Sequence, residues 1–281
     1  MTSFRSSRAR LVEIATLVAF ALPACTTTAA PTTDAGSTGV DAASARDDAA
    51  GGNDAATTDA ARDDANLPDA GPTSYATSFD GDERPIVEDG HWRLGEREGI
   101  DWQDVVIADG LAFGAGASPD AYDDCVGVRA DPPTSRHTVR ATIHRDAGFD
   151  PAYNQELEVI VGGTIEPHSI HLYEVLWSVA GNFQIVRWDG ALGVFDVSLP
   201  LTGGGAGTPV DGDVLEVSYD ASNAADVVIT VRKNGVELAQ AHDTSDLRLT
   251  SGNPGLSFFS RATDASEMSR YCFSDWSYTV P

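Results

Sequence analysis

The segment Asn154–Trp188 places the strongest constraint on what this chain can fold into. Its sequence is NQELEVIVGGTIEPHSIHLYEVLWSVAGNFQIVRW, in which three runs of alternating residues are separated by Gly-Gly-Thr and Ala-Gly-Asn. Val, Ile, Leu, Tyr and Trp favour strands and Gly and Asn favour turns, so the pattern predicts a β-meander. In the first run Leu157 and Val159 point to one face of the sheet. Glu156 and Glu158 point to the other face, which we expect to present paired carboxylates to water or to a ligand.

The same kind of pattern continues along most of the chain after residue 75. Lys233-Asn234-Gly235 joins two alternating runs, and Asn-Gly is the strongest short hairpin signal because both residues tolerate positive φ. No stretch of ten or more residues has helical periodicity. We therefore predict an all-β fold, an antiparallel two-sheet sandwich over residues 75–281. The candidate strands are 75–79, 91–94, 104–107, 110–113, 122–129, 137–144, 154–161, 168–177, 182–188, 194–199, 213–219, 226–232, 235–241, 254–260 and 271–280.

Residues 1–24 have the features of a secretory signal peptide. Three arginines precede the short apolar run 11–22, which is too short to span a bilayer, and Leu22-Pro23-Ala24-Cys25 follows. This ending resembles a bacterial lipobox, in which Cys25 receives lipid and becomes the new N-terminus. Thr26 after it favours the outer membrane. The alternatives are an ordinary signal peptide and a buried N-terminal helix.

Residues 25–74 form a region of quite different composition. Thr, Ala, Asp and Gly make up almost all of it, with nine Asp against two Arg and only Val40 and Leu67 as sizeable aliphatic residues. Such a segment has no apolar surface to bury and cannot offset its chain entropy. We expect a disordered, acidic linker between the lipid and the domain.

The net charge of the chain is −25, and residues 75–281 contribute −20 of it. A domain this acidic is repelled by nucleic acid and by anionic lipid headgroups, so these partners are disfavoured. Divalent cations and neutral ligands suit it better. The acidity also has a simpler explanation, which is that it keeps an exported protein soluble.

With Cys25 assigned to lipid, Cys125 and Cys272 remain as an even pair in an exported domain. Disulfides are permitted there, so we predict a bond between them. It would link an early strand to the last one, and closing so long a loop contributes about 4–5 kcal/mol. Two free thiols are the alternative.

Several motifs of the domain, taken in order, resemble the concanavalin A-like lectin and glucanase group, which includes laminin-G-like domains. They are Ser78-Phe79-Asp80, Arg187-Trp188-Asp189-Gly190, Asn234-Gly235, the run Asn253–Ser260, and Phe273-Ser274-Asp275-Trp276. The resemblance covers roughly residues 75–281. It implies a jelly roll of two curved sheets with the first and last strands adjacent, and a concave face that in relatives often meets sugars. Fold alone does not assign function.

Glucanases of this group resemble E-x-D-x-x-E on a concave strand, and retaining hydrolysis needs two carboxyl groups across the scissile bond. Here Glu156 and Glu158 share a face, but Val161 stands where the acid/base would be. Val161 cannot transfer a proton. Whether the protein is an enzyme stays open, with hydrolysis by this mechanism disfavoured and paired surface carboxylates the simplest interpretation.

Other candidates for ligand binding lie in the same meander. His171, Tyr173 and Trp177 share a parity, so they line one face, which is either a ligand face or core. Arg187 completes this set. A calcium site is a further candidate, since the resemblance brings acidic residues of distant segments together and Ca²⁺ prefers oxygen ligands. These residues are Asp80, Asp123, Asp124 and Asp275.

The sequence therefore predicts a lipid-anchored envelope protein that displays a non-catalytic binding domain. Carbohydrate is the leading ligand class, and it rests on the family resemblance alone. A polysaccharide hydrolase or lyase with an unrecognised active site is one alternative. A structural or adhesive envelope protein is the other.

Overall fold

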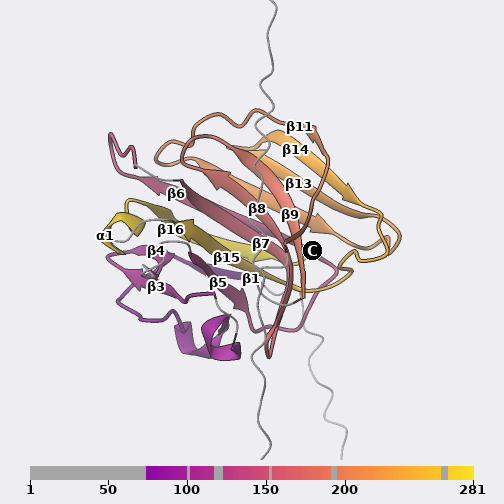
Figure 1. The fold of residues 1–281 in the computed structure, drawn as a ribbon, viewed down its shortest axis with the longest axis horizontal. Coiled ribbons are helices and arrows are strands. Elements are labelled where there is room, and N and C mark those ends of the chain that lie inside the picture. The colour runs from indigo at the N-terminus through magenta and orange to yellow at the C-terminus, as the bar shows by residue number, and fades with distance from the viewer. Residues whose placement is uncertain (1–73, 100–101, 117–122, 152–153, 191–194, 261–264) are drawn as a thin grey trace, which may run out of the picture. The chain divides into compact units, whose positions relative to one another are not determined.

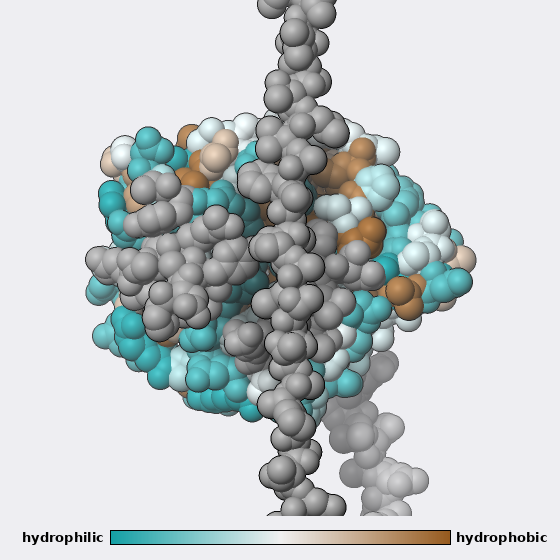
Figure 2. Space-filling view, in the orientation of Figure 1, coloured by the Kyte–Doolittle hydropathy of each residue, from teal (hydrophilic) through white to brown (hydrophobic). Residues whose placement is uncertain are grey.

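The computed structural model describes residues 74–99, 102–116, 123–151, 154–190, 195–260 and 265–281. The predicted signal peptide, Cys25 and almost all of the predicted linker lie outside these residues. In the described part of the chain, no helix is both long enough and apolar enough to span a bilayer. The visible face of this part is largely hydrophilic, with small separate hydrophobic patches (Figure 2).

Two antiparallel sheets make up the domain (Figure 1), which confirms the predicted all-β sandwich. Sheet A has the order β11 (Leu201–Gly203), β14 (Val236–Asp243), β13 (Val227–Lys233), β12 (Val214–Asp220), β6 (Arg136–Arg145), β16 (Tyr271–Thr279), β4 (Leu111–Gly114) and β3 (Val105–Ala108), with β1 (Ser74–Thr77) also paired to β16. Sheet B has the order β10 (Phe195–Ser198), β9 (Phe183–Gly190), β8 (Ser169–Ser178), β7 (Gln155–Glu166), β15 (Asn253–Ser260), β5 (Asp123–Arg129) and β2 (Trp92–Leu94).

Helical structure in these residues is limited to three short elements, namely η1 (Glu88–Gly90), η2 (Glu96–Glu98) and α1 (Ala265–Met268). The first and last strands are adjacent, as the resemblance implied, since β1 pairs with the end of β16. The hairpin at Asn234 and Gly235 is also confirmed. Their φ angles are 51° and 79°, the positive values that a type I′ turn needs at both central positions.

The main hydrophobic core lies between the two sheets. Alternation in β12 works as predicted, with Leu215, Val217 and Tyr219 buried and the residues between them part-exposed. From sheet B, Leu157 and Val159 of β7 join the same core cluster. These two strands thus contribute every second side chain to the interior, which is the packing expected of a β-sandwich.

The prediction of a turn at Gly162-Gly163 is wrong. β7 continues through these glycines to Glu166, and its pairing with β8 shifts register between Val161 and Thr164. Gly162 adopts φ 59°, so the glycines form a β-bulge in a long strand. The reversal follows Glu166, which pairs with Ser169.

The predicted disulfide is also wrong, because Cys125 and Cys272 form no disulfide bond and are both buried in the core. Cys125 lies on β5 of sheet B, whereas Cys272 lies on β16 of sheet A. In their own sheets Cys125 is opposite Phe258 and Cys272 is opposite His144. Cys272 instead donates its thiol hydrogen to the carbonyl oxygen of Ser269 at 3.1 Å.

Candidate functional site

A cluster of acidic residues lies on the face of sheet B that points away from the main core. A second, smaller apolar cluster marks this outer face, and Ile160 of β7 and Leu172 of β8 belong to it. Glu158 shares the parity of Ile160 on β7, and Glu174 shares that of Leu172 on β8, so both glutamates lie on the outer face.

Strand register brings these two glutamates close together. Glu158 is opposite Leu176 and Glu174 is opposite Ile160, which makes the two carboxyl groups diagonal neighbours on adjacent strands. They are 1% and 3% exposed. The prediction that Glu158 faces water is therefore wrong, although its neighbour Glu156 is part-exposed.

We call the set Asp124, Glu156, Glu158, Glu174 and Trp188 the acidic face. Trp188 of β9 is part-exposed, and its indole N–H donates to Oε2 of Glu174 at 2.7 Å. The ring of Trp102 meets that of Trp188 edge-on, with centroids 5.1 Å apart. The acidic face thus combines an accessible aromatic ring with carboxyl groups below and beside it.

Electrostatics on the acidic face favour protonation of the buried pair. Burial raises the pKa of Glu158 well above its usual value, and the carboxyl groups of Glu174, Asp124 and Glu156 raise it further. Burial also raises the pKa of Glu174, with Asp124 and Glu156 adding to the shift, while the Trp188 hydrogen bond opposes it. Both shifts favour the protonated form of these carboxyl groups relative to a glutamate in water.

One polar atom of the buried pair, Oε2 of Glu158, lacks a hydrogen-bond partner within the described residues, and Ser257 lies opposite Glu158 on β15. A buried polar group without a partner costs roughly 1–3 kcal/mol. Clustered, protonatable and incompletely satisfied carboxyl groups are typical of functional sites, which makes the acidic face the leading candidate.

Sequence reasoning found Glu156 and Glu158 but did not select Glu174, Trp188 or Ser257. The sequence predicts that Glu174 points to the opposite face of its strand from Tyr173, because the two residues are neighbours in the strand. The pairing of Glu174 with Glu158 could not be predicted, since the register of β7 against β8 changes at the glycine bulge.

The structure places Tyr173 and Trp177 in the core between the sheets, with no exposed surface. The sequence left open whether these two side chains bind a ligand or belong to the core, and the structure places them in the core. The hydroxyl of Tyr173 donates to Oδ2 of Asp243 at 2.8 Å, and the indole N–H of Trp177 donates to the carbonyl oxygen of Gly207 at 2.8 Å.

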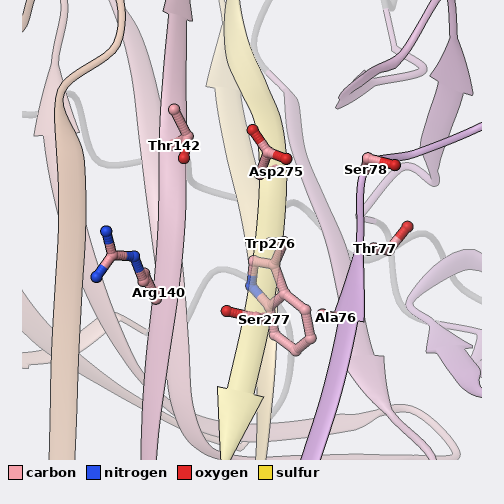
Figure 3. A pocket seen from close by; sticks show the side chains of 8 residues that line it. All are labelled: Ala76, Thr77, Ser78, Arg140, Thr142, Asp275, Trp276 and Ser277. Atoms are coloured by element: carbon pink, nitrogen blue, oxygen red, sulfur yellow. The ribbon is translucent and has the colours of Figure 1, made fainter.

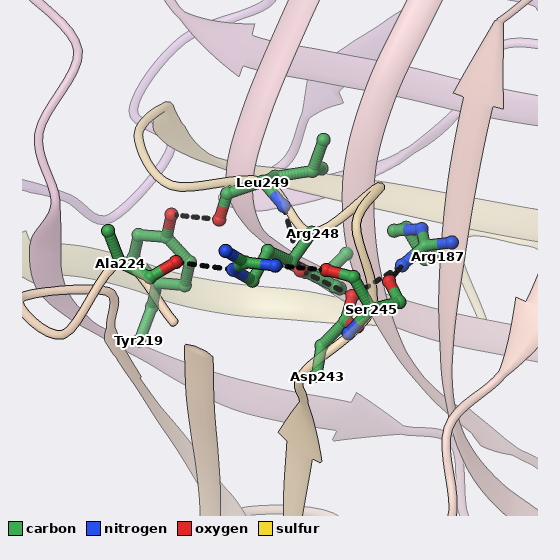
Figure 4. A network of polar contacts seen from close by, with 8 residues as sticks. Arg187, Tyr219, Ala224, Asp243, Ser245, Arg248 and Leu249 are labelled. Carbon is green, nitrogen blue, oxygen red and sulfur yellow. Dashed lines mark hydrogen bonds and ion pairs between the residues drawn. The ribbon is translucent and has the colours of Figure 1, made fainter. Parts of the chain in front are cut away.

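Arg187 is likewise buried, and it forms an ion pair that connects the sheets (Figure 4). Its Nη1 donates to Oδ2 of Asp243 on β14 at 2.5 Å and to Oγ of Ser245 at 2.6 Å. Burial alone would raise the pKa of Asp243, but hydrogen bonds from Ser245, Tyr173 and Arg187 outweigh it and lower the pKa. This arrangement is a structural clamp, and none of its groups reaches the acidic face.

The four aspartates proposed for calcium are not gathered in one place. Asp275 lies on β16 of sheet A, whereas Asp124 lies on β5 of sheet B. Asp80 is exposed in the segment after β1, and the side chain of Asp123 lies outside what the structure describes. Among the described residues, no three His, Cys, Asp or Glu side chains form a group that could hold a metal ion.

A polar groove of about 360 Å³ lies on the outer face of sheet A (Figure 3). Neighbouring strands β1, β6 and β16 form it, and Asp275 is the one acidic residue of its lining. Its lining residues are Ala76, Thr77, Ser78, Arg140, Thr142, Asp275, Trp276 and Ser277. It is the second candidate surface for a polar ligand.

No protein-family model matches this chain. A search of curated proteins also finds no match. Solved structures with a similar fold include peanut lectin with a 9mer peptide, at 12% identity and TM-score 0.42, covering 75% of this chain and 97% of that chain. Lotus tetragonolobus seed lectin is similar at 12% identity and TM-score 0.43, covering 74% and 98%. The carbohydrate-binding module CBM66 from Bacillus subtilis is similar at 11% identity and TM-score 0.39, covering 70% and 96%.

Proposed function

We propose that this protein is a carbohydrate-binding module that holds its ligand against the acidic face. The observation that carries the proposal is the buried pair Glu158 and Glu174, with Oε2 of Glu158 lacking a partner among the described residues and Glu174 accepting from the part-exposed ring of Trp188. Such a pair destabilises the fold at neutral pH, so a role in function accounts for its presence.

The chemistry of the acidic face suits a sugar. Carboxyl groups accept and, when protonated, donate hydrogen bonds, which matches the alternating character of sugar hydroxyls. The part-exposed indole ring of Trp188 offers a rigid apolar surface for the C–H face of a pyranose. Part-exposed Glu156 and Trp188 are the first contacts available, and the buried glutamates determine the polarity behind them.

The test is a glycan-panel binding assay on the purified protein, with Trp188→Ala as the principal variant. We expect saturable binding that weakens at least tenfold in this variant, equivalent to about 1.4 kcal/mol. Asp275→Asn, in the groove on sheet A, is the matched control and should leave the affinity unchanged. Binding that survives Trp188→Ala but is lost in Asp275→Asn would refute the acidic face as the site.

Hydrolysis is the second candidate function, and the paired glutamates favour it. Glycoside hydrolysis uses two carboxyl groups, one of them with a raised pKa that acts as general acid. Val161, at the position expected for the acid/base, is a core residue, but Glu174 supplies a second carboxyl group from the neighbouring strand. Release of reducing ends in the same assay, lost in both Glu158→Gln and Glu174→Gln, would establish an enzyme; binding without product would support the binding module.

We also infer that the domain is displayed on a lipid anchor at Cys25, in the outer membrane. The basic start, the apolar run and the lipobox-like Leu22–Cys25 support this. Labelled palmitate should enter the wild-type protein and be absent from Cys25→Ser in the expressing bacterium. Equal labelling of both, or of neither, would contradict the anchor.

A further inference from the structure

Ser169, His171 and Asp189 form a hydrogen-bonded chain at the end of sheet B. Ser169 and His171 are two residues apart on β8, so their side chains point to the same face, and Asp189 lies directly opposite His171 on β9. Nδ1 of His171 is 2.6 Å from Oδ1 of Asp189. Nε2 of His171 is 3.0 Å from Oγ of Ser169.

The partners of the imidazole determine its tautomer. The carboxylate of Asp189 can only accept, so Nδ1 carries the hydrogen and donates it. Nε2 is then the acceptor for the hydroxyl hydrogen of Ser169. A base that is hydrogen-bonded to a hydroxyl and oriented by a third group is the arrangement that activates a serine nucleophile.

These groups are accessible from solvent. The side chains of His171 and Asp189 are 33% and 25% exposed, and Ser169 is part-exposed. His171 has the parity of Tyr173, whereas Glu174 has the opposite parity, so the chain of three lies on the other side of sheet B from the acidic face.

The combination is particular to His171 among the six histidines, within the part of the chain that the structure describes. His242 provides the closest comparison. Its Nδ1 also faces a carboxylate, that of Asp226 at 3.0 Å, but its Nε2 meets the amide oxygen of Gln240 at 3.1 Å. His242 therefore has an orienting carboxylate and no nucleophile.

We propose that Ser169 is a nucleophile for acyl transfer from carboxylic esters, with His171 as its general base and Asp189 as the positioning residue. Oγ of Ser169 bonds to the ester carbonyl carbon while its proton moves to Nε2 of His171. Collapse of the tetrahedral adduct breaks the bond to the alcohol, which leaves with that proton. Water then attacks the acyl-serine by the same route, releasing the carboxylic acid and restoring Ser169.

The exposure of the site limits which esters react. The oxyanion of the tetrahedral adduct forms in contact with water, so stabilisation by a dry, preorganised site is small. We therefore expect turnover with activated esters that carry a good leaving group, such as p-nitrophenyl acetate. A fluorophosphonate, which reports the nucleophile without requiring turnover, is the more direct probe.

The experiment uses the full-length chain with these two probes. Peptide mapping after fluorophosphonate treatment should place the adduct on Ser169, and Ser169→Ala should abolish it. Ester turnover should fall about 10²-fold or more in Ser169→Ala, the range expected when general-base-assisted attack is lost. Asp189→Asn should also lower both signals, because an amide permits the wrong tautomer of His171.

Matched controls separate this role from effects on folding. His242→Ala removes a histidine–aspartate pair that has no nucleophile and should leave both signals unchanged. Imidazole added to His171→Ala should restore part of the ester turnover, which a merely structural role would not allow. Absence of an adduct in the wild type, or an adduct that persists in Ser169→Ala, would overturn the proposal.

Discussion

His137 allows a quantitative prediction of how stability depends on pH. Its ring is 1% exposed on β6 and lies 4.9 Å from the ring of Tyr219. Nδ1 is 3.0 Å from Oγ1 of Thr134, and the backbone N–H of Gly162 donates to Nε2 at 3.4 Å. Both ring nitrogens are therefore engaged with the imidazole neutral, and burial lowers the pKa of His137 to about 3.

The sign follows from the two protonation states. Above pH 6.5 the imidazole is neutral in the folded and the unfolded chain, so it adds no pH dependence. Below pH 6.5 His137 becomes protonated in the unfolded chain but stays neutral in the folded chain. The free energy of unfolding therefore falls with pH until the pH approaches 3. Between pH 8 and pH 5 this loss amounts to about 2 kcal/mol, at 1.36 kcal/mol for each unit below 6.5.

The assay is urea unfolding followed by tryptophan fluorescence at pH 8 and pH 5, for wild type and His137→Asn. The variant is less stable at both values because it loses ring packing, but the stability gap should shrink by about 2 kcal/mol at pH 5. His242→Gln reports the effect of removing a surface histidine. A gap that stays constant within about 0.5 kcal/mol, or a His137 ring NMR signal that titrates near pH 6.5, would refute the reasoning.

Three further predictions concern buried polar groups and thiols. Glu158→Gln should stabilise the protein increasingly as pH rises above about 4.5, because a raised folded pKa means that stability is lost as the carboxyl group is forced to ionise; thermal melts at pH 4 and pH 8 measure this, and an equal shift at both values would contradict it. Asp243→Asn should cost about 3–5 kcal/mol in chemical unfolding, because it removes the charge of one partner of a buried ion pair, whereas Arg187→Met with Asp243→Leu should recover most of the loss. Cys125 and Cys272 should resist maleimide in the folded protein and react after unfolding without reductant; protection that persists in denaturant would indicate a disulfide.

The fold could be predicted from local patterns because burial on one face imposes a period of two on each strand. The alternation in β12 and the Asn234-Gly235 hairpin were confirmed, and so were the paired first and last strands that the family resemblance implied. The disulfide was predicted because two cysteines remain once Cys25 is assigned to lipid. An even number of cysteines does not say whether the two thiols meet in the folded domain. The prediction of a turn at Gly162 was wrong because a glycine pair is compatible with a β-bulge as well as with a chain reversal.

The candidate sites were only partly readable. Glu158 was selected, but its burial was not, because parity assigns a side chain to a face and not to water or to protein. His171 was selected for sharing a face with Tyr173, yet its partners Ser169 and Asp189 became visible only through the pairing of β8 with β9.

What the sequence determined by itself is therefore the class of fold and the composition of the segment that precedes the β domain. Each depends on the residues within a short window and on their hydrophobicity. The tertiary structure decided which polar groups of different strands meet: Glu158 with Glu174, His171 with Asp189, and Arg187 with Asp243. Those contacts depend on strand register, on one β-bulge and on the packing of the two sheets. A one-residue shift in the register of a strand would move each of its side chains to the opposite face.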